Sequence, residues 1–326
     1  MRRFDCLAAG RILQRSAADL NNPAETREID RLLQQAAACM PPQWWLPPDF
    51  ALSSPGEDST QGLPLDETMR FIDQYVHYHL LARLHLPYLL PSPTNNKHDH
   101  LYSKITAVNA SREVVTRFVS FRSICPTASY CRGVDFLAFI ACSTLCLAHI
   151  EACGQSQGRL EDAGNAGPSD LGFLVHQRPG DCGLLELALA SLQQVASANN
   201  DEVASKMATV LRHLLVIEDD AAGGGSYRTS YRTDSSLSSP EYGTSEIGGI
   251  AVGKMNDEGN VLHIHIPHFG TVDIEKLSAR GIGDNMEQWT FSGMDMAVYD
   301  FIGGLEGADA AAEEPWTGWV DDGPAS

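Results

Sequence analysis

The chain has 326 residues, of which 43% are hydrophobic and 20% are charged, so it is long enough and apolar enough to bury a substantial globular core. Its 42 Asp and Glu against 23 Lys and Arg give a formal net charge of −19. Because such an acidic surface repels phosphate backbones, we expect no direct nucleic-acid binding by this chain. The eight cysteines include no CxxC pair, and no secretory signal is recognisable, so we expect reduced, intracellular thiols.

Residues 1–64 are predicted to form N-terminal helices followed by a loop that contains tryptophan. Ile29 and Leu33 recur at helical spacing, and a pair of prolines ends that pattern. Trp44 and Trp45 follow, and they offer a large apolar area between prolines. We therefore expect them to anchor the core as structural residues rather than to stack on a ligand.

Residues 65–220 carry several apolar stripes of helical length and are predicted to be the helical core. Within 101–122, Arg112 lies on such a stripe, and a guanidinium on a buried face needs an anionic or carbonyl partner. The nearest acid in the following segment is Asp135. The sequence therefore predicts that Arg112 and Asp135 pair between packed helices and serve a structural role.

The most apolar stretch, residues 136–150, invites a membrane or a metal interpretation. It is shorter than the ~20 residues that span a bilayer, which favours a buried core helix and no membrane contact. Cys142, Cys146 and His149 fall along one side of this helix, spread over too many turns for a typical structural zinc site. We predict that the two thiols act as small packed hydrophobes and that no metal is bound.

Residues 221–246 are rich in Gly, Ser and Thr and are predicted to be a flexible linker. Residues 247–283 alternate apolar and polar side chains around a turn at Glu258-Gly259, which predicts a β-hairpin. His263, His265 and His268 resemble part of the signature of metallo-β-lactamase-type hydrolases, although a proline stands where that signature has aspartate. Half-exposed strand histidines are the favoured interpretation, and a metal site is the alternative.

Residues 284–326 contain ten Asp and Glu and no Lys or Arg. Aromatic side chains are interspersed among these acids, including Trp289, Phe291, Trp316 and Trp319. Acidic residues alternating with aromatic ones are typical of activation segments that fold onto a partner groove. We therefore predict an acidic aromatic tail that recruits transcription machinery or a co-regulator. For residues 289–302, docking on the helical domain is an equal alternative, and the activation role is favoured for the residues after Gly303.

Several stretches in sequence order carry a resemblance to a known family. They are LHLPYLL at 84–90, Tyr102-Ser103 with Ala110-Ser111-Arg112-Glu113, CRGVDFLAF at 131–139, IPHFGTVDI at 266–274 and QWTFSGMDMAVYD at 288–300, with Trp44-Trp45 ahead of them. Together they resemble the regulatory region of fungal binuclear-zinc-cluster transcription factors. That resemblance implies an all-helical regulatory domain in the nucleus, which follows a zinc-cluster DNA-binding module that this chain lacks.

We therefore predict a mostly α fold, a multi-helix orthogonal or antiparallel bundle with a small β-hairpin near the C-terminus and disordered loops and tail. The predicted function is regulation of gene expression by a fungal transcription factor, without catalysis and without a cofactor, since zinc would enter only with an upstream cluster. A homodimer is compatible with this interpretation, and no residue identifies a small-molecule effector. Two alternatives are a metal-dependent hydrolase that uses His263, His265 and His268, and a non-catalytic helical scaffold.

Overall fold

The structure, a computed structural model, describes residues 1–20, 22–48, 65–90, 100–126, 132–161, 171–232, 261–266 and 270–277. The helices in these ranges are α1 (Arg2–Leu13), α2 (Ala17–Leu20), α3 (Pro23–Ala38), α4 (Leu65–His85), α5 (Leu101–Ile124), α6 (Arg132–Glu161), α7 (Arg178–Asn199) and α8 (Glu202–Ala222). Short 3-10 turns cover Pro42–Trp45, Leu86–Tyr88 and Gly172–His176. The predicted mostly α fold is confirmed.

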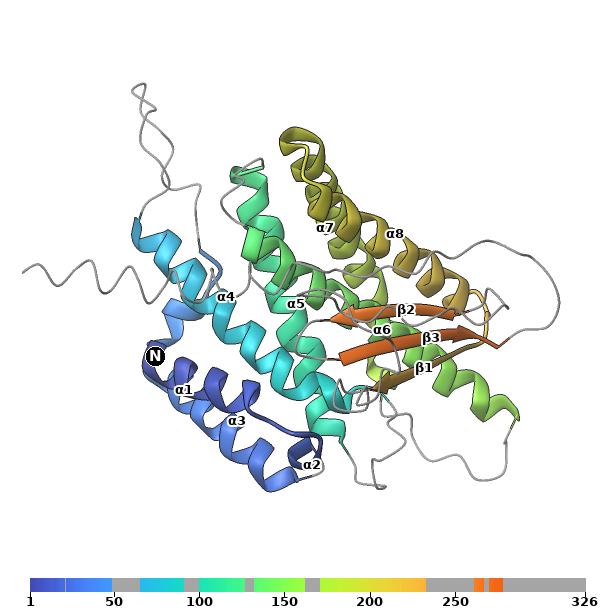
Figure 1. Ribbon diagram of the computed structural model, residues 1–326, viewed down its shortest axis with the longest axis horizontal. Coiled ribbons are helices and arrows are strands. Elements are labelled where there is room, and N and C mark those ends of the chain that lie inside the picture. The colour runs from blue at the N-terminus through green and yellow to red at the C-terminus, as the bar shows by residue number, and fades with distance from the viewer. Residues whose placement is uncertain are drawn as a thin grey trace, which may run out of the picture.

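Helices close together in the chain pack against each other at the two ends of the bundle. Figure 1 shows α1 to α3 gathered against α4 at one end, and α7 with α8 at the other end. α5 packs against α4, α6 and α7, so it lies at the centre of the bundle. α7 and α8 form an antiparallel pair with a tight connection between them.

Local signals fix where the helices begin and end. Asn22 caps α3 by accepting a hydrogen bond from the Ala24 amide at 3.1 Å. Between α7 and α8 the chain reverses at Asn200, which has the left-handed φ of 49° that asparagine tolerates well. Asp201 then caps α8 by accepting from the amides of Val203 and Ala204. These caps explain why so short a connection suffices.

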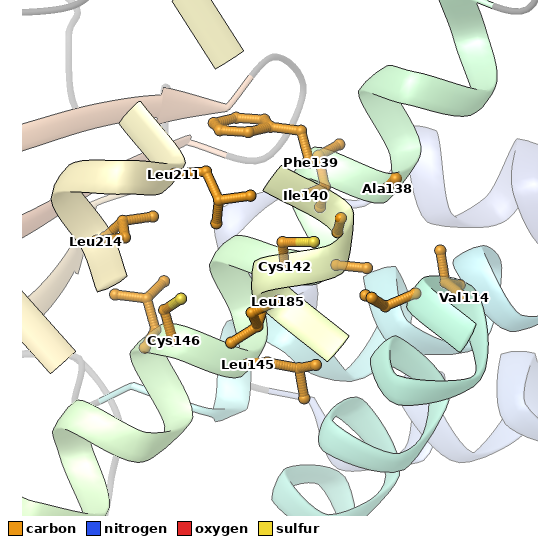
Figure 2. Packing of buried hydrophobic residues seen from close by; sticks show 14 of the residues in the cluster. Val114, Ala138, Phe139, Ile140, Cys142, Leu145, Cys146, Leu185, Leu211 and Leu214 are labelled. Carbon is orange, nitrogen blue, oxygen red and sulfur yellow. The ribbon is translucent and has the colours of Figure 1, made fainter. Parts of the chain in front are cut away.

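One large core cluster joins α4 to α8 and the sheet. Figure 2 shows its centre, where Cys142, Leu145 and Cys146 of α6 face Leu185 of α7 and Leu214 of α8. Among the described residues, α6 is the helix long and apolar enough to cross a membrane, yet 83% of its apolar window is buried inside the protein. It is therefore a core helix, as the sequence predicts.

A second, smaller cluster lies apart from this core. It joins α1 and α3 to one side of α4 and contains the buried residues Ala8, Ile12, Ile29, Leu33, Leu80 and Leu84. α4 thus has two packed sides, one toward the main core and one toward the N-terminal helices.

The small sheet differs from the expected hairpin. Its described strands are β1 (Tyr227–Arg232), β2 (Val261–Ile266) and β3 (Gly270–Lys276), all antiparallel in the order β1-β3-β2. β1 lies inside the predicted linker 221–246, so that part of the prediction is wrong. β1 is ordered because Tyr231 and Thr229 are buried and Thr229 donates to Glu151 of α6 at 2.7 Å. β2 is present as expected, but its described partner is β3; the predicted turn at Glu258-Gly259 lies outside the described residues.

Candidate functional site

The predicted contact between Arg112 and Asp135 does not form. Arg112 on α5 bonds Asp181 of α7, from Nε to Oδ1 at 2.6 Å and from Nη2 to Oδ2 at 2.8 Å. Asp135 at the start of α6 instead accepts from Arg122, at 3.0 Å from Nε and at 2.5 and 2.6 Å from Nη2. The prediction was wrong because Arg122 lies one short connection before Asp135, on the side of α5 that faces α6.

Asp181 is a buried hub that joins three helices. Besides Arg112 of α5 it accepts from His149 of α6, whose Nε2 lies 2.9 Å from Oδ2. Arg112 also donates to Gln177 at 2.7 Å and to Asn109 at 2.9 Å. Burial by itself would raise the pKa of the Asp181 carboxyl, but the hydrogen bonds from Arg112 and His149 outweigh it and hold that pKa below its usual value. The carboxylate is therefore charged, and it ties α5, α6 and α7 together.

The pair of Arg122 and Asp135 is more deeply buried, with 1% and 3% of the two side chains exposed. Here burial dominates, and it raises the pKa of Asp135 to about 6 even though Arg122 opposes that shift. Tyr75 of α4 donates to the Val134 carbonyl beside this pair at 2.7 Å. The start of α6 is thus fixed to α5 and α4 by polar contacts inside the core.

Arg117, between these two arginines on α5, is also buried, at 1% exposure. It donates to Gln74 of α4 at 2.8 Å and to the Trp45 carbonyl at 3.0 Å, and it pairs with Glu113. Its guanidinium lies 4.5 Å from the centre of the Tyr78 ring. The tryptophan segment is therefore held to α4 and α5 largely through its backbone.

Trp44 and Trp45 themselves are half-buried, not central to the core. The rings of Trp44 and Trp45 meet edge to face at 4.9 Å, and Trp45 also contacts His77 and Tyr78 of α4. The Trp45 indole donates to the Ala37 carbonyl at 3.3 Å. These contacts support a structural role for the two side chains, which remains our interpretation.

The two cysteines of the α6 stripe pack as hydrophobic side chains, whereas its histidine makes a polar contact. Cys142 and Cys146 are fully buried, and burial raises the pKa of both thiols far above the usual range. His149 is engaged by Asp181. Within the described part of the chain, no three His, Cys, Asp or Glu side chains come together as a metal site.

The remaining predicted site residues are not brought together in the described part of the chain. The backbone of β2 pairs His263 with Asp273 and His265 with Thr271, while His268 lies outside the described residues. Trp289, Phe291, Trp316 and Trp319 also lie outside them.

Three residues that form buried polar contacts between helices were not identified from the sequence, namely Arg117, Arg122 and Asp181. One available signal was the spacing of Arg112, Arg117 and Arg122 at five-residue steps. At about 100° per residue, each step turns the side chain by about 140° around the helix, so three such residues point to three different neighbours. The structure shows this distribution, toward α7, α4 and α6 respectively.

These observations define a helical domain in which charged side chains bond neighbouring helices across the core. Over 280 residues the chain is 36% identical to the "Dehydrocurvularin biosynthesis regulator" of Aspergillus terreus, a match that covers 85% of the chain and 34% of the relative. It is 35% identical over 221 residues to "Transcription factor sdnS" of Sordaria araneosa, covering 67% of the chain and 26% of that relative. It is 31% identical over 281 residues to "Probable transcription factor gsfR1" of Penicillium aethiopicum, with 85% and 34% covered.

The chain is thus a homologue of one region of fungal transcription factors and biosynthesis regulators, and the resemblance seen in its sequence is confirmed at that level. It spans about a third of the length of the curated relatives that it matches over 85% of its own length. No family model and no solved structure matches it.

Proposed function

We propose that this chain is the regulatory domain of a fungal transcription factor that controls gene expression, and that it carries out no catalysis of its own. The observation that carries the proposal is the similarity to named regulators over 85% of the chain. The proposed regions keep the boundaries predicted from the sequence. They are the N-terminal helices and tryptophan loop at 1–64, the regulatory core at 65–220, the segment 221–246 that was predicted to be a linker, the sheet region at 247–283 and the acidic tail at 284–326.

The proposal assigns different tasks to the body and the tail. The body, with α5 bonded to three neighbouring helices, is suited to pass a change at one surface to another, because its parts are coupled by packing and ion pairs. The tail combines ten acids with Trp289, Phe291, Trp316 and Trp319, which suits docking into a groove of a co-regulator or of the transcription machinery.

DNA binding is assigned to a separate module, since the net charge of −19 opposes contact with phosphate. A zinc ion would enter only with such a module. The site of action is then the nucleus, and a homodimer is compatible with this arrangement.

A reporter assay tests the proposal. The full chain is fused to a heterologous DNA-binding domain in a fungal host, and reporter output is compared with that of the Trp316→Ala/Trp319→Ala double variant and of a Val320→Ala control. We expect the parent and the control to activate and the double variant to lose most of its output. A parent fusion that is expressed, nuclear and silent contradicts the activation role.

Metal analysis separates this proposal from the hydrolase alternative. We expect purified full chain to carry far less than one zinc or iron per molecule after dialysis. A stoichiometric ion that is lost when His263 and His265 are replaced by Ala would favour the hydrolase instead. The same protein, mixed with random-sequence duplex DNA at low salt, is expected to give no retarded band.

A further inference from the structure

The N-terminal arm, defined here as residues 1–48, packs on the body as a unit with its own small core. Its aliphatic contacts with α4 belong to the second cluster, through Leu80 and Leu84. Within the described part of the arm, Leu20 is the residue whose apolar side chain packs against the main core cluster. Figure 1 shows α1 and α3 on the opposite side of α4 from α6, α8 and the sheet. The arm therefore contacts mainly α4 and the residues that follow it. Two further bonds come from α5, where Tyr102 donates to Asp30 at 2.7 Å and Arg117 donates to the Trp45 carbonyl at 3.0 Å.

Polar contacts line that side of α4 on both sides of the apolar pair. They are Arg2 Nε to Asp73 Oδ1 at 2.8 Å, Asp5 Oδ1 to His77 Nδ1 at 3.0 Å, Asp30 Oδ1 to His85 Nε2 at 3.5 Å, and Arg15 Nη2 to the Tyr88 hydroxyl at 2.6 Å. Their spacing along the chain places them on one stripe. The interface thus combines a small aliphatic cluster with several polar contacts, and such a mixed interface resembles the contacts of domains that separate and rejoin.

The two histidines distinguish this stripe from the rest of α4. His77 and His85 are buried, and each meets a buried carboxylate supplied by the arm, Asp5 from α1 and Asp30 from α3. His85 is also held by Ser103 of α5 at 3.0 Å, so its ring keeps its orientation when the arm is absent. The stripe thus offers two imidazoles, of which His85 is held by α5, with an aliphatic strip between them.

We propose that the arm is a removable cover, and that the strip beneath it, His77, Leu80, Leu84 and His85, is a docking site for an acidic amphipathic helix of a partner protein. The arm itself shows what fits. α1 presents Asp5 with Ala8 and Ile12 on one face, and α3 presents Ile29, Asp30 and Leu33. A partner helix that carries one carboxylate beside aliphatic residues three or four positions apart reproduces those contacts.

Release of the arm uncovers a small cluster that is separate from the main core, and the polar groups of the interface return to water. Such a unit opens more readily than the main core, as weakly packed segments do. This inference goes beyond the regulatory function proposed above, since it holds for any role of the chain.

Hydrogen exchange on the full chain tests whether the arm opens as a unit. Leu33→Ala removes aliphatic contact from the arm cluster alone, whereas Leu185→Ala, the matched control, does so in the main core. We expect Leu33→Ala to lower protection in α1 and α3 at least tenfold and to change α6 and α8 less than twofold. Equal loss in all helices, or no loss in α1 and α3, would overturn the proposal.

A binding experiment tests the docking site. The probe is a fluorescein-labelled peptide of α3, Pro23–Ala38, titrated with the full parent chain and with the Leu33→Ala chain. A covered site weakens the apparent affinity by the fraction that is open, so we expect the variant to bind at least tenfold more tightly. The same peptide with Asp30→Asn is expected to bind at least fivefold more weakly. Equal affinity of both chains, or no binding to either, overturns the proposal.

Discussion

Removal of the Arg112 side chain tests the role of the Asp181 hub. In Arg112→Ala the Asp181 carboxylate, 2% exposed, keeps His149 but loses two charge-assisted hydrogen bonds. Breaking a fully buried pair costs about 3–5 kcal/mol, because the remaining charge has no partner. The Arg112 side chain is 22% exposed, so water already screens it in part, and we expect a loss of about 2–4 kcal/mol in the free energy of unfolding.

The matched control is Arg31→Ala. Arg31 pairs with Glu28 on the surface of α3, with both side chains more than two-fifths exposed. Exposed pairs of this kind contribute about 0–1 kcal/mol, so the control is expected to change stability by less than 1 kcal/mol. Both variants lose the same type of side chain, but Arg112 and its partner are far more buried than Arg31 and Glu28.

Urea unfolding followed by circular dichroism measures both variants, and a double-mutant cycle with Asp181→Asn isolates the pair. We expect a coupling energy of about 1.5–3 kcal/mol between Arg112 and Asp181. A cost below about 1 kcal/mol for Arg112→Ala, or a coupling near zero, would refute the reasoning that the hub holds α5 to α7.

Three further predictions concern other buried groups. Burial, reinforced by Arg83, lowers the pKa of His79 to about 3. Between about pH 3 and pH 6.5 the unfolded chain therefore binds a proton that the folded chain does not, and the free energy of unfolding falls as the pH drops. In His79→Phe the loss of unfolding free energy between pH 6.5 and 5.0, measured in urea, is expected to be smaller by about 2 kcal/mol. Cys146→Ser, which buries a hydroxyl among apolar side chains, is expected to cost about 1–3 kcal/mol, whereas Cys39→Ser at the surface is neutral by the same urea assay. Tyr75→Phe, which removes a buried hydrogen bond to the Val134 carbonyl, is expected to cost about 0.5–1.5 kcal/mol by thermal unfolding.

The helical content was predictable because its signals are local. Apolar side chains at helical spacing, a proline after a capping asparagine at α3, and the reversal at Asn200 all depend on residues within one or two turns. The burial of Cys142 and Cys146 was predictable for the same reason, since both lie within an apolar run of helical length. Each of these conclusions needs no knowledge of what lies across the core.

Strand β1 shows the opposite case. The segment around Tyr227–Arg232 reads as a linker because it is short, polar and followed by Ser and Gly. It is ordered by Ile274 and Val272 of β3, its neighbours in the ladder, and by Glu151 of α6. These partners are more than 40 residues away along the chain, and propensity contains no information about them.

The wrong partner predicted for Arg112 also results from contacts that are distant along the chain. A buried guanidinium on α5 does require an acceptor, and each of Arg112, Arg117 and Arg122 has one. Which acceptor it takes depends on the direction in which each side chain leaves the helix and on which helix lies there. Proximity along the sequence favoured Asp135 for Arg112, but Arg122, ten residues further on, points toward Asp135 instead.

That arrangement explains why an acidic chain places three arginines inside its core. Each guanidinium has several donors in a fixed plane, so one side chain can bond a carboxylate or carbonyl on a neighbouring helix while its stem packs against α5. With Arg112 toward α7, Arg117 toward α4 and Arg122 toward α6, every direction around α5 has one specific contact. A helix that slid by one turn would leave all three charges buried without partners, so the arginines fix the register of the bundle as well as its stability.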